Sequence, residues 1–326
     1  MMNKCILLFL MIIFSTSCSS GEKSFREKMK ERIAIKMDKK IDEKYKSSEL
    51  SFSLNVNGVD RKYLLHVPAK YDNKKPTPLL FAFHGGGGSM EHMASDQKYK
   101  QISKSEENGH IVVFPNGYSR LPTGKFATWN AGKCCGEART TNSDDLAFVK
   151  AMLVRVKSEY NIDSKKIYAT GMSNGGLFSY RLACEMSDVF SAIAAVAGTD
   201  NTIECHQVRP ISILHIHAQN DDRVLFSGGA GFEKTKEMVT EFVSVNDSIS
   251  KWVKLNQCPS PPKRVLSVKG AYCDEYSGCK SNAKVKLCVT ESGKHSWPGG
   301  EKNRGDEAPS KAVSANDLMW DFFNRY

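Results

Sequence analysis

The stretch IYATGMSNGGLFSYRLACE, residues 167–185, decides the fold of this chain. An apolar run typical of a buried strand comes first, the turn GMSNG follows, and the remainder can form a helix. Glycines on both sides of Ser173 permit a sharp strand-to-helix turn, because a Cβ there would clash with neighbouring backbone. The pattern G-x-S-x-G is too short to be specific by itself, so the role of Ser173 depends on what surrounds it.

Strand-like and helix-like segments alternate on both sides of this turn. Residues 50–56 (LSFSLNV) and 61–67 (RKYLLHV) flank NGVD, which predicts an antiparallel hairpin. Residues 78–85 contain a short apolar run that predicts a buried strand, and residues 144–159 have helical periodicity with acidic residues in the first turn. We therefore expect an α/β fold with a mostly parallel central sheet, antiparallel N-terminal strands and helices on both faces, in one domain over residues 51–326.

Residues 1–18 have the three-part layout of a secretory signal: Lys4, an apolar run over residues 5–14, and a short polar stretch that ends at Cys18. The run is too short to span a membrane as a permanent helix. Cys18, followed by two serines, also fits a lipoprotein signal, although Ser15 stands where leucine is usual. Two outcomes remain open: cleavage with secretion, or lipidation of Cys18 with attachment to the membrane of the cell envelope.

Residues 19–50 are rich in lysine and glutamate, and an apolar side chain recurs at every fourth position. The positions are Phe25, Met29, Ile33, Met37, Ile41 and Tyr45. This spacing predicts a helix with one apolar stripe. We interpret the segment as a charged amphipathic tether whose stripe lies on the body of the protein, with a partner-binding or membrane-surface helix as the alternative.

The formal net charge of +10 raises the question of nucleic-acid binding. The basic residues are spread along the chain without an arginine-rich or aromatic-interleaved tract. We therefore expect a mildly basic solvated surface and no nucleic-acid partner. The oligomeric state has no signature in the sequence.

The chain has ten cysteines, of which Cys5 and Cys18 lie in the predicted signal. The eight that remain are an even number, which in an exported chain favours up to four disulfides over free thiols. Cys134 and Cys135 are adjacent and would form a strained ring if bonded to each other, so we expect each to have a distant partner. No two C-x-x-C pairs occur, which argues against a structural zinc site.

A serine hydroxyl becomes a good nucleophile when a base removes its proton and an acid orients that base. His295 lies well downstream of Ser173, in SGKHSWPGG, just after the strand-like run KVKLCV. Between them, the apolar run of ILHIHAQNDDRV ends at Asp221 and Asp222. Because the carboxyl ends of parallel strands meet at one edge of a sheet, we expect these side chains to converge, with Asp221 as the acid and Asp222 as the alternative.

An acyl-transfer site also needs N–H groups that bind the oxyanion. The stretch FAFHGGGG, residues 81–88, ends a strand-like run in four glycines whose amides can point inward, and Gly86 is among them. The N–H of Asn174 is the second candidate donor. A nucleophile, an acid, a base and a glycine loop in this order are much less expected by chance than the serine turn alone.

Other residues near these motifs have simpler interpretations beside the functional ones. Trp129 and Trp297 are candidates to contact the substrate, but Trp129 can equally pack in the core and Trp297 can equally fix its loop. His215 and His217 are two apart on a predicted strand and face the same side of it. No third ligand is evident, so we expect no metal there.

Together these motifs resemble the secreted polyhydroxybutyrate depolymerase and feruloyl or acetylxylan esterase family of α/β-hydrolases. The matching stretches are RKYLLHVP, FHGGGG, FPNG, WNAGKCCG, DDLAFV, IYATGMSNGGLFSYRLACE, AAVAG, HAQNDDRV and HSWPGG. The resemblance implies the α/β-hydrolase fold, Ser173 as nucleophile, Asp221 as acid and His295 as base. It also implies oxyanion donors near Gly86 and Asn174.

The resemblance extends over about residues 50–326 and implies a disulfide between Cys258 and Cys279. Two features depart from the family. HAQND replaces the usual His-Gly opening of the acid loop, and residues 226–242 look longer than usual, which suggests a loop that reshapes the mouth of the substrate site.

We therefore predict an exported serine esterase that hydrolyses carboxylic esters through an acyl-enzyme and needs no cofactor. The resemblance implies that the substrates are polyhydroxybutyrate-type oligoesters or feruloyl and acetyl esters of plant polysaccharide. A catalytically inactive binding protein of the cell envelope, built on the same fold, is the alternative. A missing nucleophile, acid or base would favour it, and the sequence supplies a candidate for each.

Overall fold

The computed structural model describes residues 29, 36, 51–230, 241–301 and 307–325. The predicted signal over residues 1–18 lies outside the described residues, as does the predicted tether over residues 19–50 apart from Met29 and Lys36, which are helical and exposed. From residue 51 on, the described residues belong to one compact unit. Within the described ranges, every helix is too short or too polar to cross a membrane.

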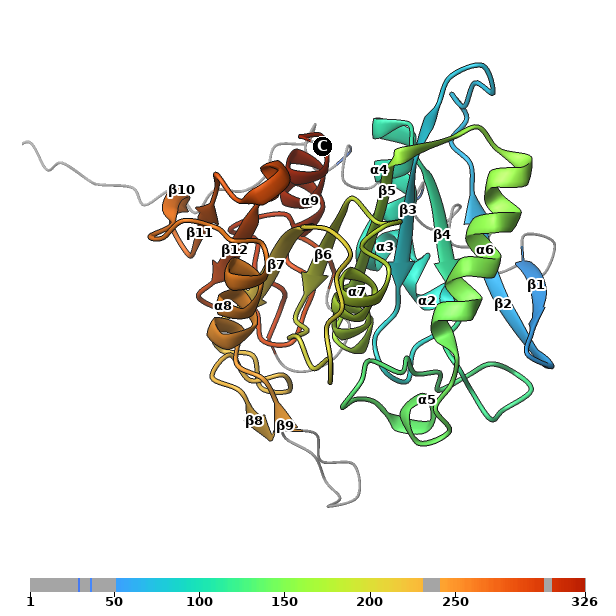
Figure 1. Cartoon of the computed structure of the whole chain (residues 1–326), viewed down its shortest axis with the longest axis horizontal. Helices are drawn as coiled ribbons and strands as arrows, with labels where there is room; N and C mark the ends of the chain where they lie inside the picture. The colour runs from blue at the N-terminus through green and yellow to red at the C-terminus, as the bar shows by residue number, and fades with distance from the viewer. Residues whose placement is uncertain (1–28, 30–35, 37–50, 231–240, 302–306, 326) are drawn as a thin grey trace, which may run out of the picture. The chain divides into compact units, whose positions relative to one another are not determined.

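A ten-stranded sheet runs through this unit in the order β1-β2-β4-β3-β5-β6-β7-β12-β11-β10 (Figure 1). Its strands are β1 Ser51–Val56, β2 Val59–His66, β3 Thr77–Phe83, β4 Ile111–Pro115, β5 Ile162–Met172, β6 Ala192–Val196, β7 Ser212–Ala218, β10 Lys263–Val268, β11 Ala271–Tyr276 and β12 Val285–Thr290. Six neighbouring strands, β4-β3-β5-β6-β7-β12, pair in parallel. At the N-terminal edge β1 pairs antiparallel with β2, and β2 pairs antiparallel with β4. The predicted sheet is therefore confirmed, and the structure adds an antiparallel pair, β10 and β11, at the opposite edge.

Helices cover both faces of the sheet, as predicted, and bury two hydrophobic clusters. The helices are α2 Met90–Met93, α3 Asp96–Tyr99, α4 Gln101–Asn108, α5 Gly136–Thr140, α6 Asp145–Glu159, α7 Asn174–Glu185, α8 Val245–Leu255, α9 Ala315–Phe323 and the short 3-10 helix η3 Lys280–Asn282. Helices α6, α7 and α8 lie over the face nearer the viewer in Figure 1 and bury Phe148, Phe178 and Trp252. Helices α2, α3, α4 and α9 bury Tyr99 and Trp320 on the other face.

The acidic pair predicted to start a helix lies at the N-terminus of α6. Asp144 caps the helix, because its Oδ1 accepts a hydrogen bond from the N–H of Ala147 at 2.9 Å. Asp145 is buried and makes different contacts, since it pairs with Arg61 of β2 at 2.7 Å and accepts the N–H of Asn130 at 2.8 Å. The buried carboxylate thus joins β2 and the loop before α5 to the start of the helix.

Four disulfides lie among the described residues. Three join cysteines distant in sequence: Cys184–Cys205, Cys258–Cys279 and Cys273–Cys288. The bond between Cys258 and Cys279 confirms the pairing that the resemblance implied. The expectation that Cys134 and Cys135 have distant partners is wrong, because they are bonded to each other across a cis peptide. The other cysteines in the described part of the chain are already paired, which leaves neither of them a distant partner.

The segment expected to form a long loop, residues 226–242, contains a small two-stranded sheet. Its strands are β8 Gly229–Ala230 and β9 Glu241–Phe242, which pair antiparallel. Residues 231–240 lie outside the described residues. An effect of this segment on the substrate site stays a prediction.

Buried neutral histidines make the folded chain a poor proton acceptor in mild acid. His110 is fully buried against Trp320, with ring centroids 3.8 Å apart, and burial together with the charges of His66 and Lys70 lowers its pKa well below the usual value. Burial also lowers the pKa of His84 to about 4. An unfolded chain protonates such histidines below about pH 6.5, so the free energy of unfolding should decrease as the pH falls from about 6.5 toward about 4.

Replacing His110 by phenylalanine should make this pH dependence shallower. His110→Phe keeps a ring against Trp320 and removes one group that protonates in the unfolded chain, so the decrease between about pH 6.5 and pH 5 should shrink by up to about 2 kcal/mol. Urea unfolding at several pH values measures this. The control is His206→Gln, which changes a side chain that is 79% exposed and should leave the slope unaltered. A slope in His110→Phe as steep as in the wild type would contradict the argument.

Candidate active site

Ser173 stands at the tight turn between β5 and α7. Its backbone has φ 56° and ψ −123°, a conformation that is rare for a residue with a side chain. The flanking glycines have no room for one: a Cβ on Gly171 would overlap the backbone of Gly175, and a Cβ on Gly175 would overlap the carbonyl of Phe83 in β3. The N–H of Ser173 donates to the carbonyl of Val196 in β6 at 2.8 Å. These contacts hold Ser173 at the carboxyl edge of the sheet, where it lines a cleft.

The glycine loop, residues 85–88, leaves β3 and packs against the serine turn. A Cβ on Gly85 would lie 3.4 Å from Cβ of Ser173, and one on Gly86 would lie 3.6 Å from Cβ of Asn174. The loop and the turn therefore lie so close that a Cβ added to either glycine would contact the turn. Gly86 and Asn174, which carry the two predicted oxyanion donors, therefore lie in neighbouring segments of backbone beside Ser173.

The backbone N–H groups of the glycine loop have distinct partners. Those of Gly87 and Gly88 donate to backbone carbonyls at 2.9 and 3.0 Å. The N–H of Gly86 has no acceptor within the described part of the chain. Asn174 is the first residue of α7, a position where the helix offers no acceptor for the N–H. Both groups are free to bind an anionic oxygen.

His84 fixes the glycine loop from behind, a role that the sequence did not reveal although the residue stands in FHGGGG. Its Nδ1 lies 2.8 Å from the carbonyl of Gly85, and its Nε2 lies 2.9 Å from the N–H of Gly117. A carbonyl accepts and an N–H donates, so Nδ1 carries the proton and Nε2 accepts. Burial lowers the pKa of His84 to about 4, which keeps this neutral form in place at neutral pH.

Asp221 and His295 lie in contact at the carboxyl ends of β7 and β12. His295 Nδ1 is 2.9 Å from Asp221 Oδ2 and 3.1 Å from Oδ1, and Oδ1 also accepts the N–H groups of Arg223 and Val224. Burial alone would raise the pKa of Asp221, but the charge of His295 and hydrogen bonds from His217 and His295 hold it well below its usual range. Asp221 is therefore a carboxylate at neutral pH, and its bond to Nδ1 leaves Nε2 of His295 available.

Ser173, His295 and the glycine loop line the same cleft, which has a volume of about 160 Å³. Asp222 also lines it, but its carboxylate lies 3.6 Å from Nζ of Lys294 and is half exposed. Of the two neighbouring acids, the structure therefore brings Asp221 to the histidine. The predicted nucleophile, acid, base and oxyanion donors all come together at this edge of the sheet.

Trp129 and Trp297, the candidates to contact the substrate, are both buried. Trp129 donates its indole N–H to the carbonyl of His84 at 3.0 Å and stacks on Phe178 with ring centroids 5.2 Å apart. Trp297 packs edge-on against Tyr99, which lines the cleft. Neither indole lines the cleft itself, which favours the alternative interpretations: core packing for Trp129 and support of the cleft wall for Trp297.

His215 and His217 lie side by side on β7, as predicted from their spacing. Their rings are parallel with centroids 5.2 Å apart, and His215 Nε2 lies 3.0 Å from His217 Nδ1. Among the residues that the structure describes, no cluster of three or more His, Cys, Asp or Glu side chains is placed to hold a metal ion. The pair contacts Asp221 instead, through His217 Nε2 at 3.3 Å from Oδ2.

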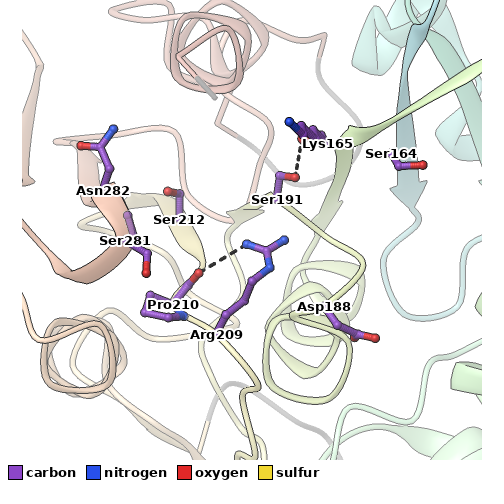
Figure 2. A pocket seen from close by; sticks show the side chains of 10 residues that line it. Ser164, Lys165, Asp188, Ser191, Arg209, Pro210, Ser212, Ser281 and Asn282 are labelled. Atoms are coloured by element: carbon purple, nitrogen blue, oxygen red, sulfur yellow. Dashed lines mark hydrogen bonds between the residues drawn. The ribbon is translucent and has the colours of Figure 1, made fainter.

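A larger hollow lies at the opposite edge of the sheet (Figure 2). It has a volume of about 400 Å³ and is lined by residues near the starts of β5 and β7, such as Lys165 and Ser212, and by Arg209. Figure 2 shows the hydrogen bond there from the hydroxyl of Ser191 to the backbone carbonyl of Lys165. Ligands of parallel α/β sheets bind at the carboxyl ends of the strands, and the predicted site residues lie at that end. We therefore assign the smaller cleft as the candidate active site.

A model of the family described as "Putative esterase" matches residues 55–297. The chain belongs to this esterase family. It is 31% identical over 241 residues to feruloyl esterase B of Piromyces equi, a match that covers 72% of this chain and 42% of that enzyme. It is 31% identical over 273 residues to the protein named "Probable feruloyl esterase C" of Aspergillus niger, and this match covers 82% of this chain and 84% of the relative.

The fold of the esterase is also found in solved structures. An acetyl xylan esterase from Aspergillus awamori superposes with a TM-score of 0.58 at 12% identity, covering 85% of this chain and 99% of that one. At this identity the likeness concerns the fold, and it confirms the predicted α/β-hydrolase architecture. Family membership places the chain among the carboxylic ester hydrolases.

The close approach of Gly175 to the backbone of β3 predicts that one added methyl group there destabilises the fold. Gly175→Ala places a Cβ on the backbone of β3, which cannot move without disturbing the sheet, so we expect a loss of several kcal/mol in stability. Gly86→Ala is the matched control, because its Cβ would meet Asn174 at 3.6 Å, an ordinary contact distance. Thermal unfolding of the two variants measures the difference. Equal melting temperatures would show that the turn is not as tight as described.

Proposed function

We propose that the chain is a serine esterase in which Ser173 is the nucleophile, His295 the base and Asp221 the acid. The observation that carries this proposal is the shared cleft. A serine in a strained turn and a histidine that is hydrogen-bonded to a buried carboxylate both open onto it.

The proposal assigns a residue to each step of ester hydrolysis. His295 Nε2 takes the proton as Ser173 Oγ attacks the ester carbonyl, and the N–H groups of Gly86 and Asn174 bind the oxyanion that forms. Collapse of this intermediate expels the alcohol, which receives the proton from His295. Water then attacks the acyl-enzyme with the same histidine as base and releases the acid. Asp221 stabilises the imidazolium at both stages.

We propose feruloyl or acetyl esters of plant saccharides as the substrate class. The support is the kinship with enzymes named feruloyl esterase over more than two thirds of this chain. Oligoesters of the polyhydroxybutyrate type are the alternative substrate, which the same assays compare. Export through residues 1–18, with Cys18 as a lipid attachment point, also stays a proposal. Disulfides in the described part of the chain are consistent with an oxidising compartment.

An exposed aromatic residue near the cleft fits such substrates. Phe126 is 72% exposed and has φ 54°, so the loop holds a bulky side chain outward in an unfavourable backbone conformation. The next residue, Ala127, pairs with Gly88 in an antiparallel bridge and accepts the N–H of Gly87, and both glycines line the cleft. Cα of Phe126 is therefore within about 9 Å of the rim. We propose that its ring packs against a ring of the substrate.

Substitutions at the two neighbouring acids test the catalytic assignment. Ser173→Ala should abolish hydrolysis of p-nitrophenyl acetate and labelling by a fluorophosphonate probe. Asp221→Asn should lower kcat by about a thousandfold or more, because an amide cannot stabilise the imidazolium. Asp222→Asn is the matched control and should stay within about threefold of the wild type, since its carboxylate pairs with Lys294. Steady-state kinetics measure all three.

Two results would overturn the proposal. One is wild-type protein that neither hydrolyses short esters nor reacts with the probe, which would support the inactive binding protein instead. The other is a loss of activity in Asp222→Asn equal to that in Asp221→Asn, which would remove the acid from its assigned position.

Phe126→Ala tests the substrate class. Loss of ring packing should lower kcat/KM for feruloylated xylo-oligosaccharides by about threefold to tenfold and leave p-nitrophenyl acetate hydrolysis unchanged. Val208→Ala, at a side chain that is 77% exposed before β7, is the control for removal of a surface hydrophobe. A uniform effect on both substrates, or a selective loss on hydroxybutyrate oligomers, would contradict the assignment.

A further inference from the structure

A chain of buried hydrogen bonds leads from helix α7 to the candidate catalytic acid. Tyr180 Oη lies 2.8 Å from His215 Nδ1, His215 Nε2 lies 3.0 Å from His217 Nδ1, and His217 Nε2 lies 3.3 Å from Asp221 Oδ2. His217 Nε2 is also 2.8 Å from the carbonyl of Val224. All of these side chains are buried. The esterase mechanism uses none of the first three.

The carbonyl of Val224 determines the direction of every bond in this chain. A carbonyl accepts, so His217 Nε2 carries a proton that it donates to Val224, and Asp221 Oδ2 lies 3.3 Å from the same nitrogen. In a neutral His217, Nδ1 is then an acceptor, so His215 Nε2 must donate to it. His215 Nδ1 is in turn an acceptor, and the hydroxyl of Tyr180 donates to it. Every donor in the chain points toward Asp221.

A charged His217 fits the geometry poorly. It would donate from Nδ1 to His215, which would then donate to Tyr180, and the hydroxyl proton of Tyr180 would have no acceptor among the described residues. A buried donor without an acceptor is destabilising. Burial and the neighbouring His217 also lower the pKa of His215 well below its usual value, and burial and Asp200 raise the pKa of Tyr180. The neutral, one-directional arrangement satisfies every polar hydrogen.

We propose that Tyr180, His215 and His217 are positioning residues for ester hydrolysis, whose aligned hydrogen bonds hold the carboxylate of Asp221 in the orientation that accepts Nδ1–H of His295. This inference rests on the proposed function of the cleft. The N–H groups of Arg223 and Val224 fix Oδ1, and His217 is the side chain that restrains Oδ2 beside His295. The series of hydrogen bonds starts at Tyr180 on α7, the helix that begins directly after Ser173. It therefore connects the helix next to the proposed nucleophile with the proposed acid.

The kinetic test compares removal of a link with removal of an unrelated buried histidine. His217→Phe should lower kcat about tenfold or more with KM within about twofold, because the acid is misdirected while the cleft is unchanged. It should also move the acid limb of the pH profile of kcat/KM to higher pH, since a carboxylate that loses a donor holds the proton on His295 more strongly. Tyr180→Phe should show a smaller change of the same kind. His217→Gln, which keeps an N–H donor, should retain more activity than His217→Phe.

His110→Phe is the matched control. It makes the same substitution at a buried histidine on the other side of the sheet, outside the cleft and the chain of hydrogen bonds, and should keep the wild-type kcat and pH profile. Thermal unfolding reports any general loss of stability in each variant. Wild-type kcat and acid limb in both His217→Phe and Tyr180→Phe would overturn the proposal, as would the same kinetic changes in His110→Phe.

Nitrogen-15 NMR of the wild-type histidines tests the direction of the bonds without an activity assay. His215 and His217 should both be Nε2–H tautomers in which Nδ1 is the acceptor. An Nδ1–H tautomer or a cationic His217 would overturn the arrangement. If the wild type proves inactive on every ester while NMR shows the expected tautomers, the proposed function fails and the hydrogen-bond chain stands as a structural feature alone.

Discussion

The candidate active site depends on one steric constraint, the close approach of three backbone segments at Gly171 and Gly175. The end of β5, the start of α7 and the end of β3 approach so closely that a Cβ at either glycine would overlap a neighbouring backbone. The helix therefore has to begin at once after Ser173, which leaves that residue in a conformation with positive φ. The surrounding contacts hold the strained turn in place. Its result is a serine at the rim of the sheet, next to a free N–H at the helix start.

The parallel sheet brings the remaining groups to this turn. The glycine loop, Ser173, Asp221 and His295 follow β3, β5, β7 and β12, which lie close together in the strand order although their sequence positions span more than two hundred residues. Strands stand about 4.8 Å apart, so β7 is about 10 Å from β5 with β6 between them. The acid is thus too far away to act on Ser173 directly. In the proposed mechanism His295, on the loop after β12, bridges that gap, since it is hydrogen-bonded to Asp221 and lines the same cleft as Ser173.

The sequence predicted what depends on local sterics and strand order, and it did not predict what depends on side-chain packing. The serine turn was recognisable because both glycines are required by backbone contact. Asp221 and Asp222 are adjacent in the sequence, and what distinguishes them is the conformation of the loop. It directs Oδ1 of Asp221 toward the N–H groups of the same loop. The burial of Trp129 and Trp297 follows from tertiary packing, which their motifs do not encode. The bond between Cys134 and Cys135 follows from the tertiary pairing of the other described cysteines, which the sequence does not encode.

Neutral histidine serves the same purpose in two places behind the cleft. A neutral imidazole donates on one side and accepts on the other, so it can join a carbonyl to an N–H across a buried gap. His84 does this between Gly85 and Gly117 behind the glycine loop, and His215 and His217 do it in series behind Asp221. Protonation would turn each acceptor into a donor and break the arrangement. Burial, which lowers the pKa of His84 and His215, keeps these side chains neutral and is thus a condition for an ordered site.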